Sequence, residues 1–163
     1  AAHAAHVGHA AAGAGLAIAL ACDIRIAAQS AFVNAGYARV ALSGDYGIAW
    51  LLTRAVGSPI AREMMFTAER IDSARAERIG LFNRVVPDEK LQTEAFALAK
   101  VMADGPQLAL RAMKDNLDDA LTIDFPTALD REAERIVSTS HTADHREAVR
   151  AFVEKRKPRF TGN

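Results

Sequence analysis

Apolar residues recur with different spacings along the chain. In the N-terminal third, segments with helical spacing alternate with segments typical of strands. The Ala/Leu/Ile pattern of residues 15–21 suits a short buried helix. Residues 23–27 ("DIRIA") and 31–35 ("AFVNA") are predicted to be strands. Residues 42–47 ("LSGDYG") have the composition of a turn, and a helical apolar run begins at Ile48. The front third is therefore predicted to be α/β.

Glycine and proline residues mark the helix ends that follow. Gly57 is predicted to stop the first long helix, and Pro59 suits the first turn of the next one. A further short helix is predicted to be capped by Asp72 or Ser73 and to end at Gly80.

Strand patterns end at Pro87, after residues 81–86 ("LFNRVV") alternate as a last short strand. Residues 88–104 have apolar positions at helical spacing with charges between them, which predicts an amphipathic helix closed by Gly105. The helical spacing then continues over residues 106–156.

Interruptions near residues 122–126 and 138–142 divide this back part into separate helices. We therefore predict two regions. Residues 1–87 would form an α/β core that carries a site, and residues 88–163 a helical region suited to packing or subunit contacts.

The first twelve residues, "AAHAAHVGHAAA", lack the hydrophobic strand and turn signals that usually open a domain. His3, His6 and His9 recur every three residues, so on one helical face they could bind a transition metal. No acidic residue or cysteine accompanies them, and solvated histidines are the simpler interpretation. We predict no metal site.

Charge and cysteine content narrow the possible partners. The 163 residues include 20 basic and 20 acidic side chains, so the chain has no electrostatic footprint for nucleic acid or an anionic membrane. The single cysteine, Cys22, excludes an internal disulfide framework and fits a reducing cytoplasm. The longest apolar run, residues 10–22, is too short for a membrane span, and no basic segment precedes it. We expect a cytoplasmic protein that binds a small molecule or another protein.

The glycine turn in "HAAAGAGL" has three possible uses. A dinucleotide site requires a third glycine where this chain has Ile18, and an acidic residue at the end of the next strand, whereas Asp23 precedes it. Gly13 and Gly15 could instead direct free N–H groups at a developing negative charge. Alternatively, they only allow close packing of a buried helix, which spacing alone favours.

Three ordered segments resemble the crotonase family, also called the enoyl-CoA hydratase/isomerase superfamily. They are "GHAAAGAGLAIALACDIRI" with the sequence that follows it to Gly57, "MMFTAERIDSARAERIGLFNRVVPDEKL", and the C-terminal "AFVEKRKPRFTG". The resemblance implies an α/β (α+β) ββα spiral core, of which residues 1–87 would be the back portion. Residues 88–163 would then form a C-terminal helical trimerisation region. A usual family domain is considerably longer, so the chain resembles one that lacks its N-terminal part.

The resemblance also implies a substrate class. Family members bind acyl-CoA thioesters and stabilise a thioester enolate with two backbone N–H groups. One donor corresponds to Ala14, between Gly13 and Gly15, and the other would come from an upstream segment outside this sequence. No cofactor is implied, because coenzyme A is part of the substrate.

The acid/base positions separate the subclasses of this family. The two glutamates of family hydratases correspond to Ala17 and Tyr37, which disfavours hydration by the usual pair. Asp45 falls where the isomerases of phenylacetate degradation and an aromatic acyl-CoA dehalogenase carry a catalytic aspartate. In an isomerase it would move a proton along the acyl chain, and in a dehalogenase it would be the nucleophile. Tyr37 replaces a tryptophan of the dehalogenase, which favours isomerisation. Turn composition alone favours an Asp45 that hydrogen-bonds its own backbone.

Other residues have weaker patterns. Tyr37 and Trp50 could line an acyl pocket, although isolated aromatic residues are more often part of a core. His141 and His145 are four residues apart and could share a metal, but a solvated helix face explains them more simply.

The C-terminal run "EKRKPR" contains Lys155 and Lys157. It is either a solvated tail or, as in similar proteins, a source of lysines near the coenzyme A phosphates of a neighbouring subunit. The resemblance implies a homotrimer or hexamer.

The favoured hypothesis is an enoyl-CoA isomerase with Ala14 as an oxyanion donor and Asp45 as the proton shuttle. The alternatives are a hydratase with a non-standard residue set and a catalytically silent oligomeric or scaffold protein.

Overall fold

The computed structural model describes residues 2–163, and the chain divides into two compact units. The first covers residues 3–97, and the second covers residues 98–163 together with Ala2. The helix α4 (Leu91–Ala103) contains the boundary between them. Within residues 2–163, no helix has both the length and the apolar character that a membrane crossing needs.

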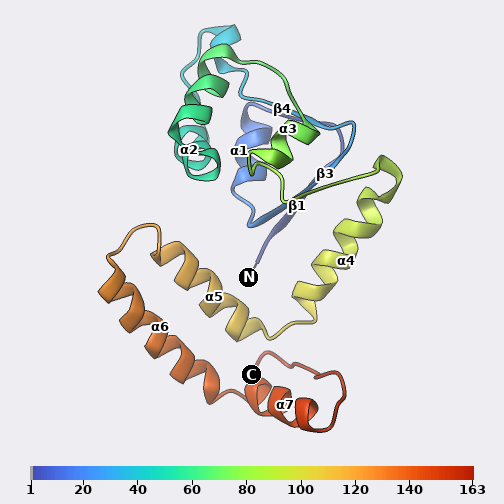
Figure 1. Cartoon of the computed structure of the whole chain (residues 1–163), viewed down its shortest axis with the longest axis vertical. Helices are drawn as coiled ribbons and strands as arrows, with labels where there is room; N and C mark the ends of the chain where they lie inside the picture. Colours follow the sequence, from blue (N-terminus) through green and yellow to red (C-terminus); the bar gives the residue numbers. More distant parts are fainter. Residues whose placement is uncertain (1) are drawn as a thin grey trace. The chain divides into compact units, whose positions relative to one another are not determined.

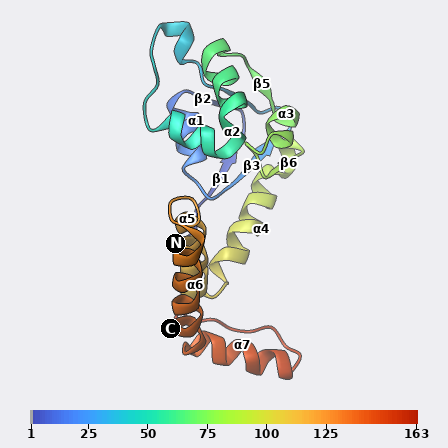
Figure 2. The same cartoon turned by 60° about the vertical axis from the view of Figure 1, so that its left-hand side comes forward.

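One small sheet of the first unit is entirely parallel (Figures 1 and 2). Its strand order is β1 (Ala4–Val7), β3 (Ile24–Ala28) and β6 (Arg84–Val86). Ala4 pairs with Ile24, and Ile26 pairs with Arg84. Helices lie between these strands in the sequence, as parallel pairing requires.

A second sheet contains the strands that directly follow β1 and β3. β2 (Ala10–Ala12) runs parallel to β4 (Phe32–Asn34), and β5 (Ile71–Asp72) pairs antiparallel with β4. Each strand pair leads into a helix, so the order β1-β2-α1 is followed by β3-β4 and then α2. This repeat is the predicted ββα arrangement.

Two helices enclose the core of this unit. α1 (Ala14–Leu20) packs against α2 (Ile48–Thr67), and both views show them adjacent (Figures 1 and 2). The backbone of α2 is non-helical at Gly57, with φ 77° and ψ 161°, so two helices meet at a kink there. This confirms the predicted stop at Gly57 and the start near Pro59. The largest fully buried side chains are Leu16, Ile26, Val33, Ile48, Leu52, Met64 and Leu81.

Short elements complete the first unit. Tyr37–Val40 forms the 3-10 helix η1, and Asp88–Lys90 forms η2 before α4. The helix α3 (Ser73–Arg78) is capped by Asp72, whose carboxylate accepts from the Arg75 N–H at 2.7 Å. The cap confirms one of the two predicted positions. The strand predicted over 81–86 is shorter, because buried Leu81 and Phe82 precede it in a turn.

The expectation for the first twelve residues was wrong. Residues 4–7 and 10–12 are strands, although alanine and histidine are poor strand formers. They are extended because β3 and β4 supply parallel partners, and that pairing comes from distant sequence. The three histidines therefore do not share a helical face. The ring of His9 packs edge-on against Phe32.

The second unit consists of helices. The end of α4 is followed by α5 (Gln107–Asp119), α6 (Phe125–Ser140) and α7 (Ala143–Val153), with breaks where they were predicted. α5 and α6 pack as a hairpin. Asp119 of α5 holds Arg131 and Arg135 of α6, each with an N···O distance of 2.7 Å.

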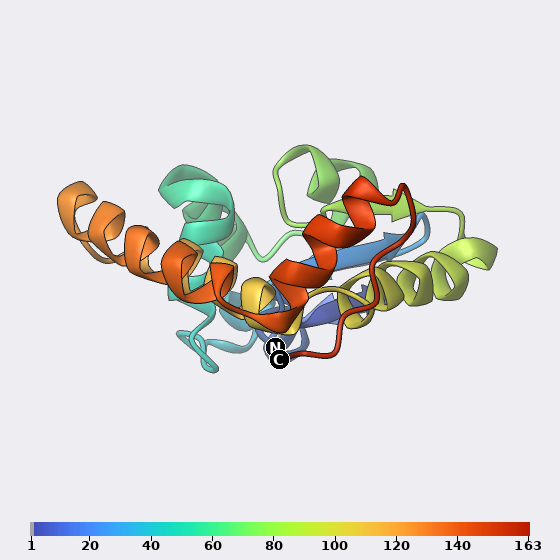
Figure 3. The ribbon, with the colours of Figure 1, turned by 90° about the horizontal axis from the view of Figure 1, so that it is seen from below.

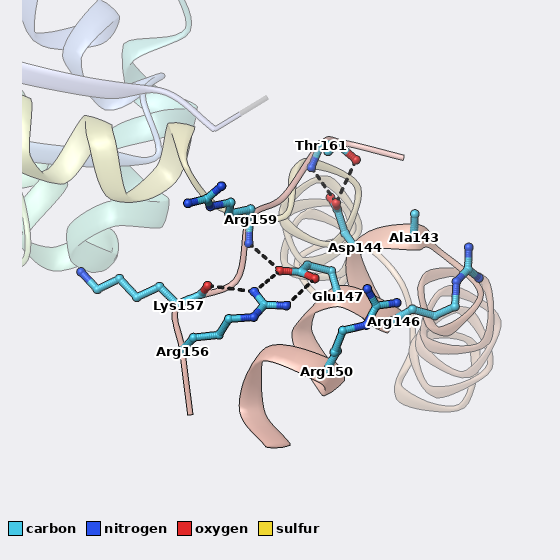
Figure 4. Close-up of a pocket in the computed structure, with 9 residues that line it drawn as sticks. All are labelled: Ala143, Asp144, Arg146, Glu147, Arg150, Arg156, Lys157, Arg159 and Thr161. Carbon is cyan, nitrogen blue, oxygen red and sulfur yellow. Dashed lines mark hydrogen bonds and ion pairs between the residues drawn. The ribbon is translucent and has the colours of Figure 1, made fainter. Parts of the chain in front are cut away.

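The C-terminal segment folds back along α7 (Figure 3). Asp144 is only 3% exposed, and its carboxylate accepts from the N–H groups of Thr161 (2.7 Å) and Gly162 (3.0 Å). Glu147 accepts two hydrogen bonds from the Arg156 guanidinium, at 2.6 and 3.0 Å, and one from the Arg159 N–H at 3.0 Å. Two carboxylates thus fix the last eight residues (Figure 4).

This arrangement predicts how the tail responds to acid. The hydrogen bonds from Arg156 and Arg159 lower the pKa of Glu147 from 4.5 to about 2. A depressed pKa contributes stability that is present above pH 4.5 and lost as the pH falls toward 2. We expect the protection of residues 156–163 from hydrogen exchange, relative to the intrinsic rate at each pH, to fall through that window. In Glu147→Gln the exchange should be fast already at neutral pH.

The matched control is Glu134→Gln, an exposed glutamate on α6. It should leave the exchange of the tail and its pH dependence unchanged. Strong protection in Glu147→Gln that does not change with pH would show that Glu147 does not hold the tail.

Candidate active site

The glycine turn connects β2 to α1 through a conformation that favours glycine. Gly13 has φ 51° and ψ −121°, a region that side chains rarely adopt. Its N–H donates to the carbonyl of Asn34 at 3.0 Å, and its own carbonyl accepts from Leu16 (3.1 Å) and Ala17 (3.2 Å). The turn is thus fixed to β4 on one side and begins the helix on the other.

Two N–H groups at the start of α1 remain available. A helix leaves its first N–H groups without intrahelical partners, and here those of Gly13 and Leu16 are used. Within the described residues, the N–H groups of Ala14 and Gly15 have no hydrogen-bond partner. Ala14, the predicted oxyanion donor, therefore has a free N–H. Its role stays a prediction.

An apolar hollow lies beside this turn. It has a volume of about 230 Å³ and contains one titratable side chain, that of His6. Gly15 and the 59%-exposed Ile18 form the α1 side of the hollow. The residues that line it are Ala5, His6, Val7, Gly8, Ala10, Ala11, Gly15, Ile18 and Ala19.

Tyr37 brings the glycine turn and Asp45 together. It begins η1 directly after Gly36 and is buried, with 7% of its surface exposed. A Cβ placed on Gly13 would stand 3.9 Å from the Tyr37 hydroxyl oxygen, so the phenol lies against the turn. The hydroxyl donates a hydrogen bond to Oδ1 of Asp45. The hydrogen bond spans eight residues of sequence.

Asp45 lies in a loop with unusual backbone angles. Gly44, Tyr46 and Gly47 have φ values of 119°, 49° and 72°. A Cβ on Gly44 would come within 2.9 Å of Ile48 Cγ2, so only glycine fits there. The carbonyl of Asp45 accepts from the Ile48 N–H at 3.0 Å, which ties the loop to the start of α2.

The Asp45 carboxylate is exposed, and one of its two oxygen atoms accepts a hydrogen bond. Within residues 2–163, its one hydrogen bond is the bond from Tyr37 to Oδ1, and Oδ2 has no partner. It makes no bond to the backbone of its own turn, so the structure does not have the local geometry that turn composition alone suggested. An accessible carboxylate oxygen beside free N–H groups can accept a proton from a bound molecule.

Burial raises the pKa of Tyr37 above its usual value, and the hydrogen bond to Asp45 raises it further. The phenol is therefore neutral at physiological pH and remains a hydrogen-bond donor. Ala17 and Tyr37 are the two positions matched to the hydratase glutamates. The Ala17 side chain is 1% exposed and belongs to the core.

The remaining sequence candidates are exposed residues. Trp50, which was expected to be a core residue, is 54% exposed, and the Arg54 guanidinium stacks 3.6 Å above its ring. His141 and His145 are exposed on the surface of the second unit. Within the described residues, no group of three or more His, Cys, Asp or Glu side chains has metal-binding geometry.

Lys155 and Lys157 are exposed in the C-terminal segment. Lys157 lines a pocket of about 920 Å³ in the second unit, where the side chains drawn in Figure 4 are mostly basic. The cationic residues around it are Arg146, Arg150, Arg156, Lys157 and Arg159.

Sequence reasoning missed two contacts that build the site. It assigned Tyr37 to an acyl pocket and did not predict its hydrogen bond to Asp45. It also passed over Asn34, which is 8% exposed and donates from Nδ2 to the Ala68 carbonyl at 2.9 Å. A buried asparagine at the end of a predicted strand was the available signal, because such a side chain requires partners.

The fold and this site define a crotonase-type α/β protein, and comparisons with known proteins agree. Residues 3–163 match the family model described as enoyl-CoA hydratase/isomerase. The chain belongs to the enoyl-CoA hydratase/isomerase family.

Individual relatives come from several bacteria. The probable enoyl-CoA hydratase of Rhodobacter capsulatus is 42% identical over 156 residues, which are 96% of this chain and 61% of the relative. The 1,2-epoxyphenylacetyl-CoA isomerase of Escherichia coli is 37% identical over 93% of this chain and 58% of its own length. The crystal structure of enoyl-CoA hydratase from Bacillus anthracis has a TM-score of 0.91 and 33% identity, covering 94% of this chain and 60% of the other. The chain thus spans about three-fifths of the length of these relatives.

Proposed function

We propose that this protein is an enoyl-CoA isomerase that moves a double bond along an acyl-CoA thioester. The observation that carries the proposal is the Asp45 carboxylate, which Tyr37 holds beside the glycine turn and its free Ala14 N–H. The similarity to the E. coli isomerase supports the same reaction class.

The proposed mechanism uses one carboxylate twice. Asp45 Oδ2 removes a proton from C2 of a 3-enoyl thioester, and the electron pair of the C–H bond passes into an enolate. The Ala14 N–H donates to the enolate oxygen as negative charge develops there. Protonated Asp45 then returns the proton to C4, which leaves the double bond between C2 and C3. Atoms and charge are conserved, and the enzyme ends in its starting state.

The substrate needs three further groups of contacts. The apolar hollow beside Gly15 suits part of an acyl chain, and Gly13 and Tyr37 shape the opposite side of the turn. The exposed Lys155 and Lys157 suit the coenzyme A phosphates of a substrate bound to a neighbouring subunit. No separate cofactor is needed, because coenzyme A arrives with the substrate, and the lone cysteine supports a cytoplasmic location.

A hydratase with a non-standard residue set is the second candidate. Its support is the 42% identity to the probable hydratase of R. capsulatus. The hydratase function is disfavoured, because neither the buried Ala17 side chain nor the neutral Tyr37 phenol can replace a glutamate as a general base. A catalytically silent scaffold protein is the third candidate.

The test is proton exchange during turnover. The full protein in D₂O should convert a 3-enoyl-CoA to the 2-enoyl isomer. Where the proton on Asp45 exchanges with solvent before its return, deuterium should appear at C4, detected by mass spectrometry. Addition of water to a 2-enoyl-CoA without isomerisation would favour the hydratase. No acyl-CoA binding by calorimetry at millimolar ligand would leave only the scaffold.

We further propose self-association, as a homotrimer or hexamer, through the helices of the second unit. Phe125, Leu129 and Ile136 lie on one face of α6 with exposures of 78%, 54% and 70%. Exposed apolar faces of this kind mark interaction surfaces. Sedimentation analysis should give an oligomer, and Ile136→Glu should lower its mass. The control Ser138→Glu, on another face of α6, should not. A monomeric parent protein would contradict this prediction.

A further inference from the structure

Within residues 2–163, the Asp45 carboxylate has a single hydrogen-bond partner, the Tyr37 hydroxyl, and that partner is well fixed. Tyr37 is buried and begins η1, and its carbonyl accepts from the Leu42 N–H at 3.0 Å. Its ring lies against Gly13, so it cannot turn away from the loop without opening the core. Asp45 is exposed and would otherwise sample several rotamers.

We infer that Tyr37 is a positioning residue of the acid/base site, which fixes Asp45 through Oδ1 and directs Oδ2 toward the substrate. This inference rests on the proposed function, because it assumes that Asp45 exchanges the proton. It assigns Tyr37 a role beyond that of an acyl-pocket wall.

Tyr37 is the group that fixes the Asp45 carboxylate, because its hydroxyl donates a hydrogen bond to Oδ1. Within residues 2–163, Asp45 has no ion-pair partner that could do this instead.

The surroundings contain few other charges. α1 has no charged residue, and the first charged side chain of α2 is Arg54, which stacks on Trp50. Arg39 is the charged residue of η1, and it is exposed. Tyr46 is the other titratable group that acts on the Tyr37 phenol. The phenol is therefore the group expected to position the Asp45 carboxylate.

The decisive variant is Tyr37→Phe, which keeps the ring and removes only the hydroxyl. We expect kcat to fall about 10- to 100-fold with KM changed less than about twofold, because Oδ2 loses its fixed direction. The control is Tyr46→Phe, the exposed tyrosine beside Asp45, which should change neither value.

A spectroscopic measurement tests the same contact without activity. In Tyr46→Phe, Tyr37 is the only tyrosine, since the chain has two. Its ultraviolet titration should lie above the usual tyrosine value, and adding Asp45→Asn should lower the midpoint. An unchanged midpoint would show that the two side chains do not interact and would overturn the inference.

The two proposals fail in different ways. If Asp45→Asn abolishes turnover while Tyr37→Phe leaves kcat unchanged, the inference about Tyr37 is wrong and the proposed function holds. If Asp45→Asn keeps full activity, the proposed function is wrong, and the inference falls with it.

Discussion

Asp45→Asn is expected to lower kcat for a 3-enoyl-CoA by about 10³-fold, within the range that general acid/base groups contribute. Asparagine has the size of aspartate and can still accept the hydrogen bond from Tyr37, so the loop should keep its conformation. It cannot take up a proton from C2, which removes both steps of the isomerisation. Binding of the thioester should change little, because Asp45 acts on the reacting carbon atoms.

The measurement combines turnover with deuterium exchange in D₂O. Both should disappear together in Asp45→Asn, while circular dichroism stays that of the parent. Asp130→Asn, an exposed aspartate on α6, is the matched control and should retain full activity. Exchange at the parent rate in Asp45→Asn would assign the proton transfer to another group.

Ala14→Pro is expected to lower kcat about 10²- to 10³-fold, the effect of removing one oxyanion donor, or about 2.7 to 4 kcal/mol of transition-state stabilisation. Proline has no N–H, and the first position of a helix is the place where it is tolerated. Ala14 is that position in α1, and its N–H makes no hydrogen bond within the described structure. The substitution therefore deletes the proposed donor and little else.

Ala14→Ser provides the control, because it adds a small side chain and keeps the N–H. It should retain activity within about threefold, whereas Ala14→Pro should lose kcat with KM nearly constant. Equal losses in the two variants would point to crowding at the turn. Parent-like kcat in Ala14→Pro would place the oxyanion donor elsewhere.

Local signals predicted most helices correctly. The kink at Gly57, the cap at Asp72 and the breaks around residues 122–126 and 138–142 depend on a few neighbouring residues. Such features follow from backbone preferences and side-chain caps, which act within one helical turn.

The strands at the start of the chain could not be predicted in this way. Ala4–Val7 and Ala10–Ala12 have weak strand propensity, and they are extended because β3 and β4 pair with them. Those partners lie about twenty residues away in the sequence. Strand formation there is a tertiary effect, which local composition does not report.

The same distinction between local and tertiary effects applies to the candidate site. The sequence by itself determined the glycine turn with its available Ala14 position, the aspartate in the turn before α2, and the family resemblance that connects them. Only the tertiary structure decided that the phenol of Tyr37 lies between Gly13 and Asp45 and donates to the carboxylate. The reason is that η1 and four residues with positive φ separate Tyr37 from α2, and no periodic pattern describes such a path. Local sequence determines backbone turns, whereas the contact between two separate side chains depends on the tertiary packing of the core.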